Sequence, residues 1–155
     1  MSFDDDLERG KIWENIIANC MRDGAFPKIR VLDGYNNYDL IDDDTGLKFE
    51  IKFDEMSKDT ENVCIEIGTK EKPAGLSQSL ATYWVHIWID EGKYVYNVIP
   101  VWELKRFIKL HREKITIRHD AGDGNSSVCL IPKAIFKHWR VHGIIPHKHL
   151  TQIKK

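Results

Sequence analysis

Apolar and polar residues alternate with two different periods along this chain, and the period predicts where helices and strands lie. Residues 4–21 place apolar side chains at roughly helical spacing, which predicts a first helix. Short apolar runs bounded by turn-forming residues predict strands at 27–32, 38–42, 47–53, 62–67, 83–89, 94–99, 115–118 and 128–131. Further helices are predicted at 74–82, 101–111 and 132–142, with a polar loop at 54–60. This order of elements predicts an α/β protein.

The strand predicted at 47–53 carries the most informative pattern. Side chains alternate between the two faces of a strand, so Glu50 and Lys52 project to the same side. The other side carries the apolar residues Phe49, Ile51 and Phe53. Three large apolar side chains indicate a buried strand, where a carboxylate and an ammonium side by side need a functional explanation.

Asp39 lies on the preceding strand, within pairing distance of Glu50 if the two strands form a hairpin about the acidic turn at 43–46. Two carboxylates beside the Lys52 amine can hold a hard cation such as Mg²⁺ or Mn²⁺ next to a scissile phosphate. The alternative is a surface hairpin whose ion pair stabilises the fold by less than ~1 kcal/mol. We favour the catalytic interpretation because of the buried opposite face.

Glu14 is a further candidate, on the first helix. It lies close to the apolar boundary of that helix and can reach inward, although its simpler interpretation is a boundary carboxylate paired with Lys11 or Arg22.

An acidic residue in the first helix, an Asp about ten residues before the tripeptide Glu50-Ile51-Lys52, and strands between them resemble the PD-(D/E)XK nuclease superfamily. The stretches N-V-C-I-E-I, K-P-A-G-L-S-Q-S-L-A-T-Y-W-V-H and G-D-G-N-S-S-V-C-L-I-P look like those of small phage-encoded nucleases and resolvases. The resemblance covers roughly residues 8–140. It implies a restriction-endonuclease-like core, a mixed β-sheet flanked by helices in the order αβββαβ.

The resemblance also implies roles for individual residues. Asp39 and Glu50 would ligate the metal together with the main-chain carbonyl of Ile51. Lys52 would orient the attacking water or stabilise charge on the phosphorane. Glu14 would complete a second ion site or hold a ligated water.

Second-tier candidates are Glu66, Ser77, Gln78 and Ser79. The chain departs from the family pattern at two places. Tyr38 stands where the motif has its Pro, and Ser79 stands where some relatives have a Gln, with Gln78 one residue away.

Composition sets the broad class. With 155 residues, 42% hydrophobic and 30% charged, the chain is predicted to form one soluble globular domain. The resemblance implies that residues 1–155 are a single nuclease domain. No apolar run approaches the ~18 residues of a membrane span, and the N-terminus is acidic where a signal peptide would be basic, so we expect a cytoplasmic protein without membrane contact. Cys20, Cys64 and Cys129 lie far apart in apolar contexts, which is typical of buried reduced thiols.

Charge is distributed unevenly along the chain. Residues 1–99 carry 11 Lys and Arg against 20 Asp and Glu, whereas residues 100–155 carry 12 against 4. Solvated helix faces explain such a bias, but a basic C-terminal part from about residue 100 could also track a phosphate backbone. The candidate DNA-binding residues are Lys105, Arg106, Lys109, Arg112, Lys133, Lys137 and Arg140.

Histidines and tryptophans add two expectations. His138 and His142 are four apart on a predicted helix, which allows a zinc site, but no Cys joins them, so a basic DNA-facing tail is favoured. Most of the five tryptophans are expected in the core, and Trp84 and Trp88 are the least certain because their strand could be exposed on one side.

Two functions follow from these observations. The first is a Mg²⁺- or Mn²⁺-dependent DNA endonuclease, which could act on branched or junction DNA as a homodimer. The second is a non-catalytic DNA-binding or assembly protein that keeps the nuclease fold.

Overall fold

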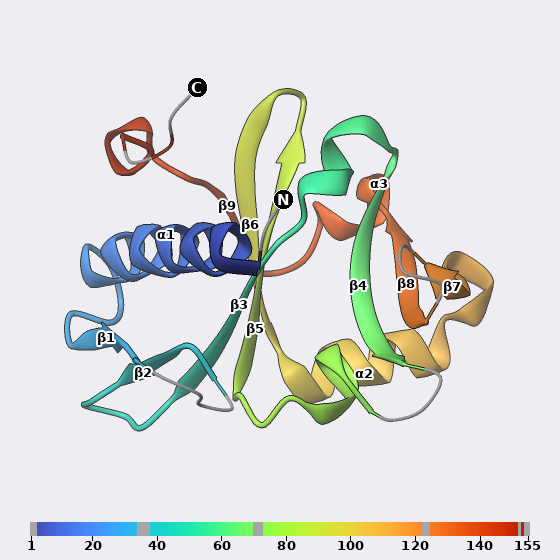
Figure 1. Ribbon diagram of the computed structural model, residues 1–155, viewed down its shortest axis with the longest axis horizontal. Helices are drawn as coiled ribbons and strands as arrows, with labels where there is room; N and C mark the ends of the chain where they lie inside the picture. Colours follow the sequence, from blue (N-terminus) through green and yellow to red (C-terminus); the bar gives the residue numbers. More distant parts are fainter. Residues whose placement is uncertain (1–2, 34–37, 70–72, 122–124, 152, 154–155) are drawn as a thin grey trace.

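The computed structural model describes residues 3–33, 38–69, 73–121, 125–151 and 153, which form helices and two β-sheets (Figure 1). The α-helices are α1 (Phe3–Arg22), α2 (Val101–Leu110) and α3 (Lys133–Phe136). The strands are β1 (Ile29–Val31), β2 (Leu40–Asp42), β3 (Lys48–Phe53), β4 (Asn62–Thr69), β5 (Tyr83–Asp90), β6 (Lys93–Pro100), β7 (Thr116–Ala121), β8 (Ser126–Pro132) and β9 (His142–Ile144). Short 3-10 helices are η1 (Glu55–Asp59), η2 (Gly75–Gln78), η3 (Arg112–Lys114) and η4 (His147–His149). The predicted α/β class is confirmed.

The larger sheet is mixed and has the strand order β1-β2-β3-β5-β6-β9. Strands β3 and β5 pair in parallel, and the other neighbours in this sheet pair antiparallel. Between β3 and β5 the chain leaves the sheet to form β4, which joins β8 and β7 in a separate antiparallel sheet. Strands β3 and β5 are thus adjacent in the larger sheet although the segment between them in the sequence contains β4 of the smaller sheet.

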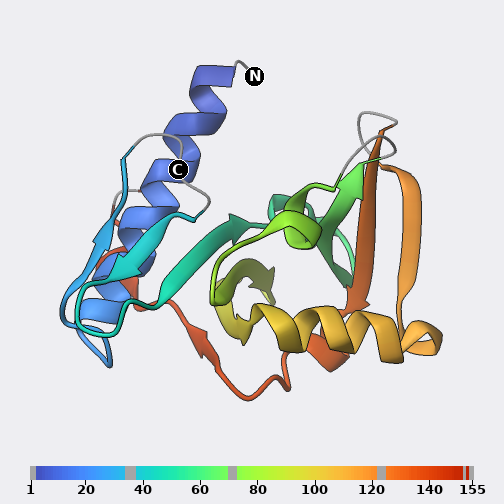
Figure 2. The ribbon, with the colours of Figure 1, turned by 90° about the horizontal axis from the view of Figure 1, so that it is seen from below.

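Strand β5 is buried on both faces and lies between two hydrophobic cores. Val85 and Ile87 face the core that α1 closes, where Ile16 and Ile17 also lie. Trp84 and Trp88 face the second core, formed with α2 and the smaller sheet, and are only 1% and 0% exposed. Figure 2 shows α1 on one side of the larger sheet and α2 with the smaller sheet on the other. The strand of Trp84 and Trp88 therefore has no exposed face.

Helix α1 packs through residues at helical spacing. Trp13, Ile16 and Ile17 lie at i, i+3 and i+4 and are buried, and the Trp13 ring stacks on Phe53 with a centroid separation of 4.4 Å. The amphipathic pattern predicted for residues 4–21 is confirmed. In the part of the chain that the structure describes, no helix has both the length and the apolar character needed to cross a membrane.

The last predicted helix is wrong beyond its first turn. Helix α3 ends at Phe136, and residues His142–Ile144 form β9 instead, which pairs with the edge of β6. Trp139 turns inward against Phe107 and Phe136. Pairing with an open sheet edge and burial of an indole together outweigh the helical pattern in this segment.

The connection from β3 to β5 also differs from expectation. The loop predicted at 54–60 contains η1, and the helix predicted at 74–82 is the shorter 3-10 helix η2. Gly75 adopts a left-handed φ of 54°, and a Cβ there would lie 2.3 Å from the Glu66 carbonyl oxygen. The segment is held so close to β4 that a regular α-helix does not form there.

Candidate active site

Strand β3 has one edge that β2 covers only in part. Leu40 and Ile41 of β2 pair with Phe49 and Lys48, and β2 extends no further along β3. Beyond that point the Asp39 carboxylate continues the edge, because its Oδ2 accepts a hydrogen bond of 2.8 Å from the Ile51 N–H. A carboxylate thus occupies the place of a strand residue beside β3.

The main chain of Asp39 is fixed on both sides. Its N–H donates to the Phe49 carbonyl at 2.8 Å, and its own carbonyl accepts from the Leu32 N–H at 2.9 Å. These two bonds hold the half-buried carboxylate between β1 and β3.

Glu50 and Lys52 lie on one face of β3, and the Lys52 Nζ is 3.9 Å from the Glu50 Oε1. The two groups differ in exposure: 16% for the Glu50 side chain and 47% for that of Lys52. Burial raises the pKa of Glu50 from 4.5 to about 7; Lys52 opposes this rise, whereas Asp39 and Glu14 add to it. The carboxylate is therefore covered while the amine reaches solvent.

Glu14 approaches the same place from α1. Burial raises its pKa from 4.5 to about 7, with a further rise from the neighbouring charge of Asp39. The Lys11 Nζ lies 3.6 Å from the Glu14 Oε1 and donates to the Leu32 carbonyl at 2.9 Å. Glu14 therefore pairs with Lys11 and lies near enough to Asp39 for that charge to raise the Glu14 pKa.

The Ile51 carbonyl lies on the same edge of β3. Alternate residues of a strand direct their main-chain groups to the same side. Because the Phe49 carbonyl and the Ile51 N–H both bond to Asp39, the Ile51 carbonyl also points to that side. One main-chain oxygen and the Asp39 carboxylate thus share an edge, with Glu50 beside them.

The carboxylate and carbonyl oxygens at this edge are suitable ligands for a small hard cation. Mg²⁺ favours oxygen ligands and commonly takes only one or two carboxylates, with water completing its octahedron. No group of three or more His, Cys, Asp or Glu side chains is already arranged around a metal position among the described residues. Asp39, Glu50 and the Ile51 carbonyl, with water, are the ligands that this edge offers.

The second-tier residues lie in other elements. Glu66 is exposed on β4. Burial first, and then Asp54 and Glu66, raise the pKa of the Cys64 thiol to about 11, which places the Glu66 charge near Cys64. Ser77 donates to the Ile67 carbonyl, and Ser79 accepts from the Ala81 N–H at 3.3 Å. Gln78 is exposed on η2.

Most of the candidate DNA-binding cations are exposed. This holds for Lys105, Arg106 and Lys109 on α2 and for Arg112, Lys137 and Arg140 after α2 and α3. Lys133 differs, because its amine donates to the Ser57 carbonyl. His138 and His142 do not share a helix, and the His142 Nδ1 lies 2.7 Å from the Asn97 Oδ1.

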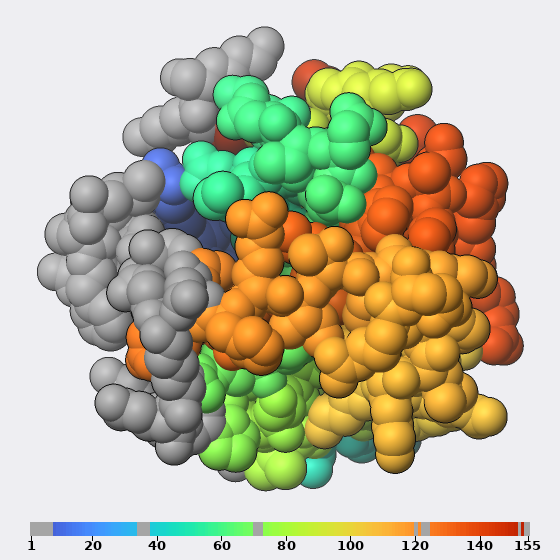
Figure 3. Space-filling view, turned by 90° about the vertical axis from the view of Figure 1, so that its right-hand side faces the viewer, coloured from blue at the N-terminus to red at the C-terminus, as the bar shows by residue number. Residues whose placement is uncertain are grey.

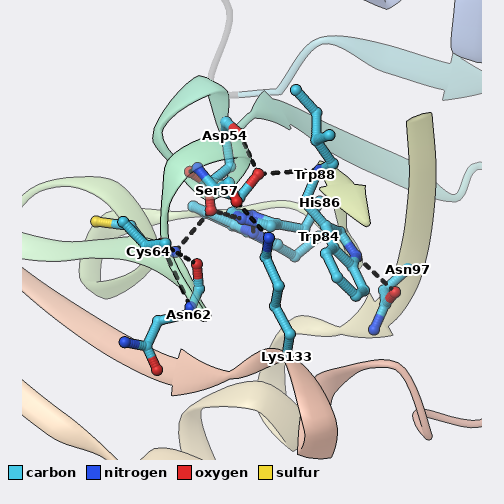
Figure 4. A network of polar contacts seen from close by, with 11 residues as sticks. Asp54, Ser57, Asn62, Cys64, Trp84, His86, Trp88, Asn97 and Lys133 are labelled. Atoms are coloured by element: carbon cyan, nitrogen blue, oxygen red, sulfur yellow. Dashed lines mark hydrogen bonds and ion pairs between the residues drawn. The ribbon is translucent and has the colours of Figure 1, made fainter. Parts of the chain in front are cut away.

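A buried polar network follows directly after the site and was not predicted. Trp84 Nε1 donates to His86 Nδ1 at 3.1 Å, so the His86 proton sits on Nε2, which donates to the Asp54 Oδ2 at 3.1 Å (Figure 4). The same carboxylate accepts from the N–H groups of Cys64 at 2.6 Å and Ser57 at 3.1 Å.

Asp54, His86 and Ser57 are the residue types of a hydrolase triad, but their contacts are structural. The Ser57 hydroxyl donates to the Asp54 main-chain carbonyl at 2.6 Å and accepts from the Ile89 N–H, so it does not contact His86 as a nucleophile would. All three side chains are buried. The network joins the end of β3 to β4 and β5.

A hollow of about 720 Å³ lies on the outer face of the smaller sheet, lined by Met56, Cys64, Arg118, Val128 and Leu130 among others. None of the candidate catalytic residues lines it.

No family model, curated protein or solved structure matches this chain.

Proposed function

We propose that the protein is a divalent-metal-dependent DNA nuclease that hydrolyses phosphodiester bonds, with a restriction-endonuclease-like core of the PD-(D/E)XK type. The observation that carries the proposal is the edge of β3, where the Asp39 carboxylate accepts from the Ile51 N–H at 2.8 Å and the Lys52 amine lies 3.9 Å from Glu50. The charges of Asp39 and Glu14 both act to raise the pKa of Glu50, which supports a cluster of carboxylates there. Clustered carboxylates destabilise a folded chain unless a cation neutralises them, which supports a metal-binding role.

The order of elements supports the proposed core. Helix α1 precedes the antiparallel strands β1, β2 and β3, and β5 then pairs in parallel with β3. This corresponds to the helix, the three-stranded meander and the further strand of the family. The second helix of that core would correspond to η2, which is a 3-10 helix here.

Each side chain has a distinct task in the proposed reaction. A bound Mg²⁺ or Mn²⁺ would neutralise the charge that builds up on the phosphate. Asp39, Glu50 and the Ile51 carbonyl would hold that ion, and Glu14 would hold a ligated water or a second ion. Lys52 is not a ligand, and its half-exposed amine can reach a phosphate from solvent, where it orients the attacking water or stabilises the phosphorane.

Labelled duplex, single-stranded and branched DNA, each incubated with and without Mg²⁺, test this proposal. The wild type should cleave at least one of them only with the metal. Lys52→Ala should lower the rate by about 10²–10³ and retain Mn²⁺ affinity in titration calorimetry. Asp39→Ala and Glu50→Ala should lose both activity and Mn²⁺ binding. Lys93→Ala, an exposed cation in β6, is the matched control and should cleave like the wild type.

Two results would contradict the assignment. Mn²⁺ binding that is unchanged in both carboxylate variants would remove the metal site. Wild-type protein that binds DNA but cleaves none of the substrates with Mg²⁺ would favour the alternative, a non-catalytic DNA-binding or assembly protein with the same fold.

A further inference from the structure

Helix α2 presents an exposed face of unusual composition. Its inward face is formed by the buried residues Val101, Leu104 and Ile108. Trp102 lies on the opposite side and is 65% exposed, whereas Trp13, Trp84 and Trp88 are at most 5% exposed. An indole of this exposure is a candidate contact for another molecule.

Cations surround Trp102 on that face. Arg106 follows it by one turn and Lys109 by two, so the three side chains form a row about 10 Å long along the helix axis. Lys105 lies beside the row, and all three cations are exposed. Figure 3 shows α2 and the residues that follow it, in gold, at the surface next to β7 and β8.

The single acidic residue of α2 is turned away from this row. The Glu103 carboxylate accepts from the Trp139 Nε1 at 3.2 Å and pairs with Arg140 at 3.5 Å. The exposed face is therefore an aromatic ring with cations and without a carboxylate of its own helix. This combination is complementary to a polyanion that also offers aromatic rings.

We propose that this face of α2 binds unpaired nucleotides of DNA, with a base stacked on the Trp102 indole and phosphates against Arg106 and Lys109. Bases within a duplex are stacked on each other and offer no free face, so the indole contributes only where the strand is unpaired. The inference rests on the proposed function in taking DNA as the ligand, and it specifies substrates with single-stranded segments. A lipid surface fits less well, because the apolar face of α2 is already buried.

Binding to two DNA ligands in EDTA, where cleavage does not interfere, tests the proposal. The ligands are an oligothymidine single strand and a hairpin duplex of equal length. Because Trp102 is the most exposed of the described tryptophans, the single strand should quench its fluorescence. Trp102→Leu should weaken single-strand binding by about 10- to 100-fold and duplex binding by less than about 2-fold. Trp102→Phe should restore most of the single-strand affinity.

Met56→Ala is the matched control, since Met56 is a 70% exposed apolar residue in η1, outside α2. It should bind both ligands like the wild type. Equal weakening of single-strand and duplex binding by Trp102→Leu, or no change in either, would overturn the proposal. So would an unchanged DNA affinity together with a loss of binding to phosphatidylserine vesicles. All these binding measurements are made without metal, so their outcome does not depend on cleavage. A protein that binds single strands but does not cut them with Mg²⁺ would contradict only the nuclease assignment.

Discussion

Asp54 links the end of strand β3 to neighbouring parts of the molecule. It follows β3 directly, and its buried carboxylate accepts hydrogen bonds from two main-chain N–H groups and from His86. A buried charge is tolerated only while its partners remain in place. The register of β3 with β5 sets Lys52 opposite His86 and Glu50 opposite Trp84, so the network lies next to both charged residues of the proposed site.

Replacing His86 by Leu should destabilise the protein by about 1–3 kcal/mol. The change leaves the Trp84 indole N–H without an acceptor and removes one donor from Asp54. His86→Gln can retain both bonds and should recover part of the loss. Urea denaturation measures the difference, with His138→Leu as an exposed control that should change stability by less than about 0.5 kcal/mol. An unchanged midpoint for His86→Leu would show that the network does not stabilise the fold.

Sequence alternation alone could place Glu50 and Lys52 on one face of a strand, because that relation spans only two residues. It could not reveal Asp54 with His86, which are 32 residues apart and meet only through the parallel pairing of β3 with β5. The expectation of a core position was wrong for Trp102, which is 65% exposed. The sequence did hold a signal, because Trp102 lies opposite the apolar positions of its own helix.

At the scale of elements, long and strongly patterned segments were predicted well and short ones were not. Helix α1 and the hairpin of β5 and β6 each bury a regular set of side chains, so pattern and structure agree. Strand β9 is three residues long and exists because the edge of β6 accepts it. Residues 142–144 form a strand because β6, far away in the sequence, pairs with them, and the local pattern of apolar residues carries no information about that partner.

Gly75 tests how tightly η2 is held against β4. Gly75→Ala should be clearly more destabilising than Gly46→Ala, although both glycines have a left-handed φ, at 54° and 75°. A Cβ at Gly46 meets nothing within 4 Å, so only the intrinsic cost of about 1–2 kcal/mol applies there. At Gly75 the same Cβ would lie 2.3 Å from the Glu66 carbonyl oxygen, and the backbone must move. Equal losses in thermal or urea unfolding would contradict this close contact.

At the scale of the whole molecule, the proposed site lies where several parts of the chain meet. Glu14 comes from the helix over one core, Asp39 precedes β2, and Glu50 is on β3 next to the strand shared by both cores. Each of these elements contributes buried apolar side chains to one core, which offsets the cost of holding like charges close together. Burial and mutual repulsion keep protons on Glu14 and Glu50 to a higher pH than in the unfolded chain.

The raised pKa values predict how stability depends on pH without metal. The unfolded chain loses these protons near pH 4.5, whereas the folded chain keeps them until about pH 7. Between these values the native state binds more protons, so the free energy of unfolding falls as pH rises. Each carboxyl would contribute about 3 kcal/mol if it were fully buried, and because both are partly exposed we expect a total on the order of 3 kcal/mol. Above about pH 7 both states are ionised and this contribution is constant. A divalent cation bound to the ionised native site reverses the loss.

Thermal melts at pH 5 and pH 8, each with EDTA and with Mg²⁺, measure this coupling. In EDTA, the contribution of Glu14 and Glu50 should make the melting temperature lower at pH 8 than at pH 5 by roughly 5–10 °C. Mg²⁺ should raise the melting temperature more at pH 8 than at pH 5, because at pH 5 the metal must displace protons from these carboxyls. Asp39→Asn should stabilise the metal-free protein at pH 8, since an amide oxygen can still accept from the Ile51 N–H while one negative charge is removed. It should also abolish most of the Mg²⁺ effect. If Mg²⁺ raised the melting temperature equally at both pH values, or Asp39→Asn were no more stable than the wild type in EDTA, these carboxylates would not form one electrostatic cluster and the proposed metal site would fail with them.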